Sequence, residues 1–202
     1  MSSQKRKYTL RARAQQQDGT RQRIVAATAE LHGEVGPART TVAEIARRAG
    51  VQRLTVYNHF PDERELFAAC GDLWLTTFPP PDPTAALALK DPAERLRAVL
   101  FAFYAWYRAT EPVTEHAQRD RLVMAGFDAV MRIKMDEPMV ALVRALAGGF
   151  DARGSQAARA GAAVALALDF WTWRCLDREG LSDAASADLM VDAVKAAAGI
   201  KG

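Results

Sequence analysis

The sequence predicts an all-α protein of about nine helices. Apolar residues recur at intervals of three and four along most of the chain, which is the period of an amphipathic helix. No stretch of alternating polar and apolar residues between turns competes with this pattern, so strands are not expected. Glycines and prolines divide the periodic segments and mark where individual helices should begin and end.

The charge of the chain is unevenly distributed. Residues 1–60 hold 11 Lys and Arg against 4 Asp and Glu, a net charge of +7, whereas residues 61–202 have a net charge of −4. A basic head on a mildly acidic body favours a polyanionic partner, either nucleic acid or an anionic membrane surface. Residues 1–19 are polar, basic and aperiodic, and we expect them to form a flexible arm.

Other classes of protein are disfavoured. The longest apolar run, 160–168, is much shorter than the roughly 20 residues that span a bilayer. No apolar segment follows the basic first residues, as it would in a secretory signal. The 2 cysteines and 3 histidines lack metal-ligand spacing, so we expect no metal, no cofactor and a reducing, cytoplasmic location.

Local signals delimit the helices of the basic head. Thr41 and Glu44 form a capping box, Gly50 supplies a tight left-handed turn, and prolines at 37 and 61 stop the preceding helices. The expected helices cover about residues 20–35, 41–49, 52–60 and 62–74.

Residues 20–66 have the organisation of a helix-turn-helix DNA-binding domain. A short helix, a glycine turn and a second short helix lie within the basic head, after a supporting helix. Ala46 and Ala49 are small enough for the two short helices to approach closely, and Val51 and Val56 fill the space between them. The candidate DNA-contacting residues are Thr41, Arg47, Gln52, Arg53, Leu54, Thr55, Tyr57, Asn58, His59 and Arg64.

These candidates have different expected roles. Arginine prefers guanine, and glutamine and asparagine prefer adenine, so Gln52, Arg53 and Asn58 are suited to reading base edges. Tyr57 either contacts phosphate or packs into the core, and His59 either contacts phosphate or serves to end its helix. The basic arm either reaches a minor groove or phosphates, or is a solvated tail.

The segment TVAEIARRAGVQRLTVYNHFPDERELF resembles the TetR family of one-component transcriptional regulators. The resemblance covers about residues 20–67 and includes the family's Ala-Gly-Val turn at 49–51, its Val-Tyr pair at 56–57, its His-Phe pair at 59–60, and the proline at 61. Leu54 departs from a usual glycine and either touches a thymine methyl group or packs against the protein. Glu63 departs from a frequent phosphate-contacting lysine, a contact that we expect Arg64 to replace in part. The resemblance implies that the remaining body, residues 67–202, binds an effector and forms the dimer.

The body should be a helical bundle that begins after a proline-rich loop at residues 78–83. The expected helices cover about residues 91–109, 112–134, 137–149, 156–179 and 183–198. Large aromatic side chains share one face of the first of these helices, and such a cluster either walls an apolar ligand pocket or is ordinary core. The candidate ligand-binding residues are Phe103, Trp106, Tyr107, Phe127, Met131, Trp171 and Arg174.

The helix expected at 156–179 is apolar on two faces, which predicts that one face packs on its own domain and the other on a partner subunit. We expect a homodimer through the last two helices, with Leu189 and Val194 of the final helix taking part. Asp169 and Arg174 interrupt the apolar helix and are an interface pair, a ligand anchor or a solvated edge.

The sequence therefore predicts a sequence-specific transcriptional repressor, which a small apolar or amphipathic ligand releases from a near-palindromic operator in double-stranded DNA. A transcriptional activator or a ligand-independent regulator of the same fold is the alternative. A helical enzyme is disfavoured, because no nucleophile motif, phosphate-binding loop or ligand cluster occurs, and no catalytic residue is expected. A membrane-surface protein is disfavoured because the basic residues flank the helix-turn-helix.

Overall fold

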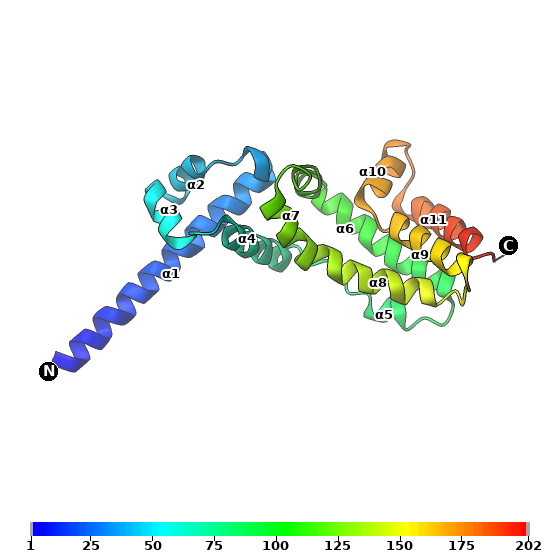
Figure 1. The fold of residues 1–202 in the computed structure, drawn as a ribbon, viewed down its shortest axis with the longest axis horizontal. Coiled ribbons are helices and arrows are strands. Elements are labelled where there is room, and N and C mark those ends of the chain that lie inside the picture. The colour runs from blue at the N-terminus through cyan, green and yellow to red at the C-terminus, as the bar shows by residue number, and fades with distance from the viewer. Residues whose placement is uncertain (1, 201–202) are drawn as a thin grey trace. The chain divides into compact units, whose positions relative to one another are not determined.

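The computed structural model describes the backbone of residues 2–200 and the side chains of residues 16–200. This part of the chain contains helices and no strand, which confirms the all-α prediction (Figure 1). None of its helices is long and apolar enough to span a membrane. The helices fall into two compact units, the first made of residues up to Phe78 together with His116–Val130, the second of Pro79–Glu115 and the residues from Met131 onward.

The first unit is built on one long helix. Its elements are α1 (Ser2–Glu34), the 3-10 turn η1 (Pro37–Arg39), α2 (Val42–Ala49), α3 (Arg53–His59) and α4 (Glu63–Thr77). The second half of α1 packs against α2 and α4, and the first half continues beyond them (Figure 1). Ile24 and Leu31 of α1, Ile45 of α2 and Val56 of α3 are buried in the shared core, so the expected apolar stripes do face one another.

The first helix begins earlier than we predicted. We expected a flexible arm over residues 1–19 and a helix from Thr20, but α1 already begins at Ser2. The segment contains many good helix formers, such as Lys, Arg, Gln and Ala, and has no proline. We predicted an unstructured arm because the segment has no apolar stripe. That absence shows only that this part of the helix buries no apolar face, and not that it is unstructured.

The second unit is a bundle around an aromatic core. Its elements are α5 (Thr84–Leu87), most of α6 (Pro92–Asp120), the π-helical turn η2 (Arg132–Asp136), α8 (Glu137–Gly148), α9 (Ser155–Ala167), α10 (Phe170–Arg178) and α11 (Asp183–Ala197), whereas α7 (Ala125–Met131) lies almost entirely in the first unit. Residues 116–130 of α6 and α7 belong to the first unit. Trp173, Phe170, Tyr104 and Leu146 are completely or almost completely buried, and α9 packs against both α8 and α11.

The helix predicted at 156–179 is two helices. Asp169 begins α10 as its N-cap, because its carboxylate accepts hydrogen bonds from the backbone N–H groups of Trp171 and Thr172 at 2.9 and 3.1 Å. The hydroxyls of Tyr104 and Tyr107 donate to the carbonyls of residues 167 and 168, each at 2.7 Å, where the helix ends. Asp169 therefore acts as a helix cap, a role that we did not consider.

Two predicted boundaries at prolines are also wrong. Pro112 lies inside α6, which continues to Asp120, because buried side chains on both sides hold the helix against the loss of one hydrogen bond. Pro138 lies in the first turn of α8, directly after the π-helical turn, and the chain stays helical from 125 to 148. The real interruption is at residues 121–124.

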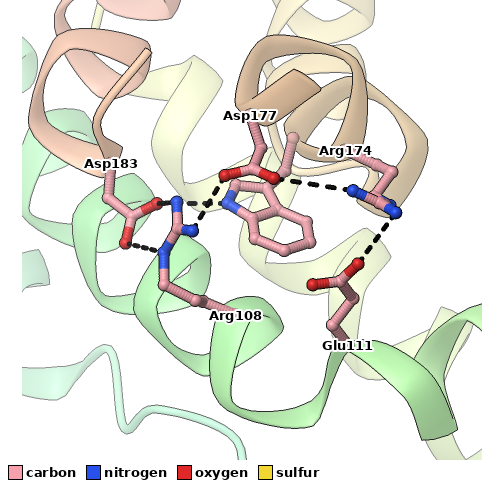
Figure 2. Close-up of polar contacts among 6 residues, drawn as sticks. Arg108, Glu111, Arg174, Asp177 and Asp183 are labelled. Atoms are coloured by element: carbon pink, nitrogen blue, oxygen red, sulfur yellow. Dashed lines mark hydrogen bonds and ion pairs between the residues drawn. The ribbon is translucent and has the colours of Figure 1, made fainter. Parts of the chain in front are cut away.

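A chain of ion pairs joins α6, α10 and α11 (Figure 2). Arg108 of α6 contacts Asp183 of α11 at 2.7 Å and Asp177 of α10 at 2.8 Å. Arg174 of α10 contacts Glu111 at 2.9 Å and Asp177 at 3.5 Å. The hydrogen bond from Arg108, opposed in part by burial, holds the pKa of Asp183 below its usual value. The guanidinium of Arg174 is thus held by carboxylates of its own chain.

Candidate nucleic-acid interface

The turn between α2 and α3 fixes the geometry of the helix-turn-helix. Thr41 and Glu44 form the predicted capping box at the start of α2. Gly50 ends the helix with a φ of 66°, in the left-handed region that favours glycine, and its N–H donates to the last turn. Val56 of α3 and Ala46 of α2 are 2% and 3% exposed, so the inner faces of the two helices pack closely.

The outer face of α3 and its N-cap carries the residues that we expected to read DNA. Gln52, Arg53 and Asn58 are exposed, and Thr55 and His59 are half-buried. Leu54 is 65% exposed and does not pack into the core. The ring of Tyr57 is 55% exposed, which removes the alternative that it is buried in the core. The structure thus brings amide, guanidinium, hydroxyl and methyl groups together on one accessible face.

The remaining candidates flank this face. Thr41 and Arg47 of α2 are exposed, and the hydroxyl of Thr41 is engaged in the capping box. Arg64 is exposed, but Asp62 holds its guanidinium through contacts of 2.7 and 3.0 Å. Any contact of Arg64 with a phosphate therefore competes with this ion pair.

Two arginines of α1 extend the basic surface, and we did not include them among the candidates. Arg21 places its guanidinium 4.5 Å from the ring centroid of Phe60, at the end of α3. Arg23 donates from Nε to the carbonyl of Ala49, at the end of α2, at 3.3 Å. A guanidinium-aromatic contact is attractive. Contacts between residues this far apart in the sequence leave no periodic pattern in it. The excess of positive charge in the head was therefore the only sequence feature that indicated these two arginines.

A segment from the end of α6 closes over the loop between α1 and α2. Asp120, which is 3% exposed, accepts hydrogen bonds from the N–H of Ala38 at 2.9 Å and from Arg119 at 2.7 Å. Gly36 has a φ of 92°, and a Cβ placed there would lie 2.4 Å from the carboxylate of Asp120. Glycine is therefore required both by the backbone conformation and by the approach of this carboxylate.

Behind this loop, Phe127 packs within the first unit. Its ring centroid lies 5.4 Å from that of Phe67 of α4 and 6.3 Å from that of His32 of α1. We had grouped Phe127 with the candidate ligand residues of the body, but it packs α7 against α1 and α4 of the first unit. Cys70 lies 3.6 Å from Nδ1 of His32, and burial raises the pKa of its thiol to about 12, so the thiol stays protonated.

Burial lowers the pKa of His32 to about 4, although the charge of Asp120 acts in the opposite direction. Below pH 6.5, the ordinary pKa of histidine, the unfolded chain binds a proton at this residue that the folded chain does not bind. The free energy of unfolding therefore decreases as the pH is lowered from about 6.5 to about 4. We expect acidification from pH 7 to pH 5 to lower the free energy of unfolding by about 2 kcal/mol through this residue. Urea unfolding of the wild type and of His32→Gln at both values measures the difference; an equally steep loss in the variant would contradict the assignment.

Replacing Asp120 by asparagine should destabilise the protein. The variant keeps an acceptor but loses the charge-assisted hydrogen bonds to Ala38 and Arg119, and we expect a loss of about 1–3 kcal/mol in thermal or urea unfolding. Asp188→Asn is the matched control, because its ion pair with Arg97 is exposed and should contribute less than about 1 kcal/mol. Equal effects of the two substitutions would mean that the Asp120 contact is not structural.

The other candidate ligand residues lie in the second unit. Phe103 and Tyr107 are buried core residues with ring centroids 6.1 Å apart, and Trp106 lies at their half-buried edge. Trp171 is 43% exposed and contacts the ring of Phe170. Met131 is half-buried. The structure thus joins Phe103, Trp106 and Tyr107 in one cluster, whereas Arg174 is held in the ion pairs described above.

Comparisons with known proteins agree with this geometry. Residues 24–70 match the family model of bacterial regulatory proteins of the tetR family. Over 47 residues the chain is 51% identical to uncharacterized HTH-type transcriptional regulators of Mycobacterium tuberculosis and Mycobacterium bovis. This match spans 23% of the chain and 25% of each relative, so it concerns about a quarter of their length.

Two solved structures share the fold. A TetR-like transcriptional regulator from Rhodococcus sp. RHA1 has a TM-score of 0.56 and 20% identity, covering 89% of this chain and 96% of that one. RolR in complex with its ligand resorcinol has a TM-score of 0.51 and 20% identity, covering 93% and 95%. The helical fold of this chain is therefore shared by both of these solved structures.

Proposed function

We propose that this chain, whose residues 24–70 match the family model of bacterial regulatory proteins of the tetR family, is a member of that family and regulates transcription by binding duplex DNA with α3 in the major groove. The observation that carries the proposal is the accessible face of α3, where Arg53 and Asn58 lie beside the N-cap Gln52. Arginine pairs with guanine, and asparagine and glutamine pair with adenine. The exposed Leu54 is suited to contact a thymine methyl group.

We propose that the protein binds a near-palindromic operator as a homodimer. Two copies of a helix-turn-helix reach successive major grooves only when a two-fold axis relates them. Three large apolar side chains of the last three helices are well exposed, namely Leu166 of α9, Trp171 of α10 and Leu189 of α11, at 59%, 43% and 46%, and we assign them to the interface. Val194, which we had expected at the interface, is completely buried in the core of its own chain.

The double variant Leu166→Glu/Leu189→Glu should shift the protein from dimer to monomer. Two carboxylates brought into an apolar interface oppose association, and we expect the dissociation constant of the dimer to rise at least about tenfold. Val140→Glu is the control, because Val140 is 50% exposed but lies on α8, which is not one of the helices assigned to the interface. Sedimentation at several concentrations measures the change; an unchanged dimer would place the interface elsewhere.

We further propose that a small apolar or amphipathic ligand binds the body and releases the protein from its operator. The helix α6 carries both the aromatic cluster around Tyr107 and, about three and a half turns further, Asp120, whose carboxylate holds the loop before α2. A ligand that prefers a shifted α6 therefore disfavours the DNA-binding arrangement by linkage. RolR is solved in complex with its ligand resorcinol, a small aromatic molecule, which is a precedent for a ligand of this class in a chain of this fold.

The experiment that tests the proposed function is selection of genomic fragments by the purified protein, followed by footprinting. Enrichment of one near-palindromic sequence over competitor DNA supports a specific regulator; failure to enrich any sequence contradicts it. Small aromatic compounds that raise the melting temperature should then be added to the complex. Release identifies a repressor with an effector, whereas retention of the complex favours the activator or ligand-independent alternative.

A further inference from the structure

We infer that residues 2–19 of α1 form a rigid helical extension that makes a second contact with DNA, across phosphates beside the operator half-site bound by α3. This inference rests on the proposed function, because it adds a second surface of the protein, outside the helix-turn-helix, that contacts the same DNA. It replaces the flexible arm that we expected from the sequence. Its basis is the continuity of α1, the place where the extension leaves the head, and its charge.

The extension begins next to the DNA-reading helix. At Arg21 the helix α1 passes the end of α3, where the guanidinium lies over the ring of Phe60. At Arg23 it passes the end of α2, where Nε donates to the carbonyl of Ala49. The residues before Arg21 therefore extend beyond the core of the first unit, starting beside the helix-turn-helix, and they form one continuous helix with the rest of α1 (Figure 1).

The length of this helix suits a flanking contact. Eighteen residues at 1.5 Å per residue extend about 27 Å, which corresponds to about eight base pairs of duplex. A helix has a diameter of about 10–12 Å and fits a major groove or lies across the phosphates, but the minor groove, about 6 Å wide, does not admit it. The sequence suggested that the arm contacts either the minor groove or the phosphates. Because the segment is helical, the phosphate contact is favoured.

The charge of the extension has the right sign and density. Five of the 11 basic residues of the head lie in this segment, at positions 5, 6, 7, 11 and 13, against a single acidic residue, Asp18. Because each neutralised phosphate releases counterions, these residues should contribute mainly salt-dependent affinity and little sequence preference. An anionic membrane offers similar charge, but the position of the extension beside α3 favours DNA.

Gly19 provides a matched pair of substitutions for testing rigidity. It lies within α1, and a Cβ placed on it meets nothing within 4 Å. Gly19→Ala keeps the helix and strengthens it, whereas Gly19→Pro removes a backbone donor and kinks or breaks the helix. The core of the first unit begins at Ile24, so neither substitution should unfold the head.

The experiment compares wild type, a deletion of residues 2–18, a variant with glutamine at the five basic positions, Gly19→Ala and Gly19→Pro. Binding is measured between about 50 and 200 mM salt on the selected operator with its flanks and on a 40-base-pair duplex of mixed sequence. We expect deletion and the glutamine variant to weaken binding to both duplexes about tenfold or more at low salt and to lower the salt slope by about two or more. Footprints should shorten on the same side of each half-site.

Gly19→Ala should bind as tightly as wild type, and Gly19→Pro should lose most of what the deletion loses. Unchanged affinity and salt slope in the deletion variant would overturn the inference, as would a deletion that impairs only binding to vesicles rich in phosphatidylglycerol. Equal binding by both Gly19 variants would overturn the rigid helix. If the wild type selects no operator, the proposed function fails. If an operator is selected but the deletion variant binds it equally well, only the inference about residues 2–18 fails.

Discussion

The triple variant Gln52→Ala/Arg53→Ala/Asn58→Ala should bind the selected operator at least about a hundredfold more weakly than wild type. Each good base contact contributes about 1–3 kcal/mol of discrimination, so the loss of three is the largest functional effect that the structure predicts. All three side chains are exposed and none belongs to the core, so the melting temperature should stay nearly unchanged. Titration of labelled operator duplex measures the affinity.

Two comparisons make this result specific. Arg153→Ala removes an exposed positive charge from the second unit and should leave operator binding within about twofold of wild type. Binding of the triple variant to mixed-sequence duplex should fall less than its binding to operator, because phosphate contacts elsewhere remain. A triple variant that still selects the operator would show that α3 is not the reading helix.

Trp173→Ala should destabilise the second unit by about 3–5 kcal/mol, the cost of removing a large aromatic side chain from a packed core. Trp173 is completely buried, and its ring packs against Tyr107 and Phe170. Its Nε1 donates to Asp183 at 3.2 Å, and the guanidinium of Arg108 lies 5.5 Å from the ring. Denaturant unfolding of both proteins at one concentration gives the difference in free energy.

Trp173→Phe is the matched variant, since it keeps most ring contacts and removes the hydrogen bond to Asp183. We expect its loss to be clearly smaller than that of the alanine variant. An alanine variant that loses less than about 1 kcal/mol would mean that α10 is not packed on the aromatic core.

Much of the DNA-binding head can be predicted from the sequence because its signals are local. The capping box at Thr41, the left-handed turn at Gly50 and the apolar spacing of α2 each act within a few residues, and all of them are found in the structure. The accessible face of α3 follows from the same spacing, because burial of Val56 turns Arg53 and Asn58 outward.

Apart from the early start of α1, which local helix propensity explains, the features that were mispredicted depend on contacts between distant segments. The helix α6 passes through Pro112 because its buried neighbours hold it, and α9 ends at Ala167 because two tyrosine hydroxyls and the Asp169 cap satisfy the freed groups. The inclusion of residues 116–130 in the first unit arises from Asp120 and Phe127, whose partners lie about 60–80 positions earlier in the chain. No periodicity reports such pairings.

The most direct test of DNA reading by α3 is the base preference of Arg53→Ala, measured at every operator position. If Arg53 contacts a base, the preference should relax at one position in each half-site, with a loss of about 1–3 kcal/mol there, and persist at the others. A uniform loss of affinity with all base preferences retained would contradict this assignment and reduce Arg53 to a phosphate contact.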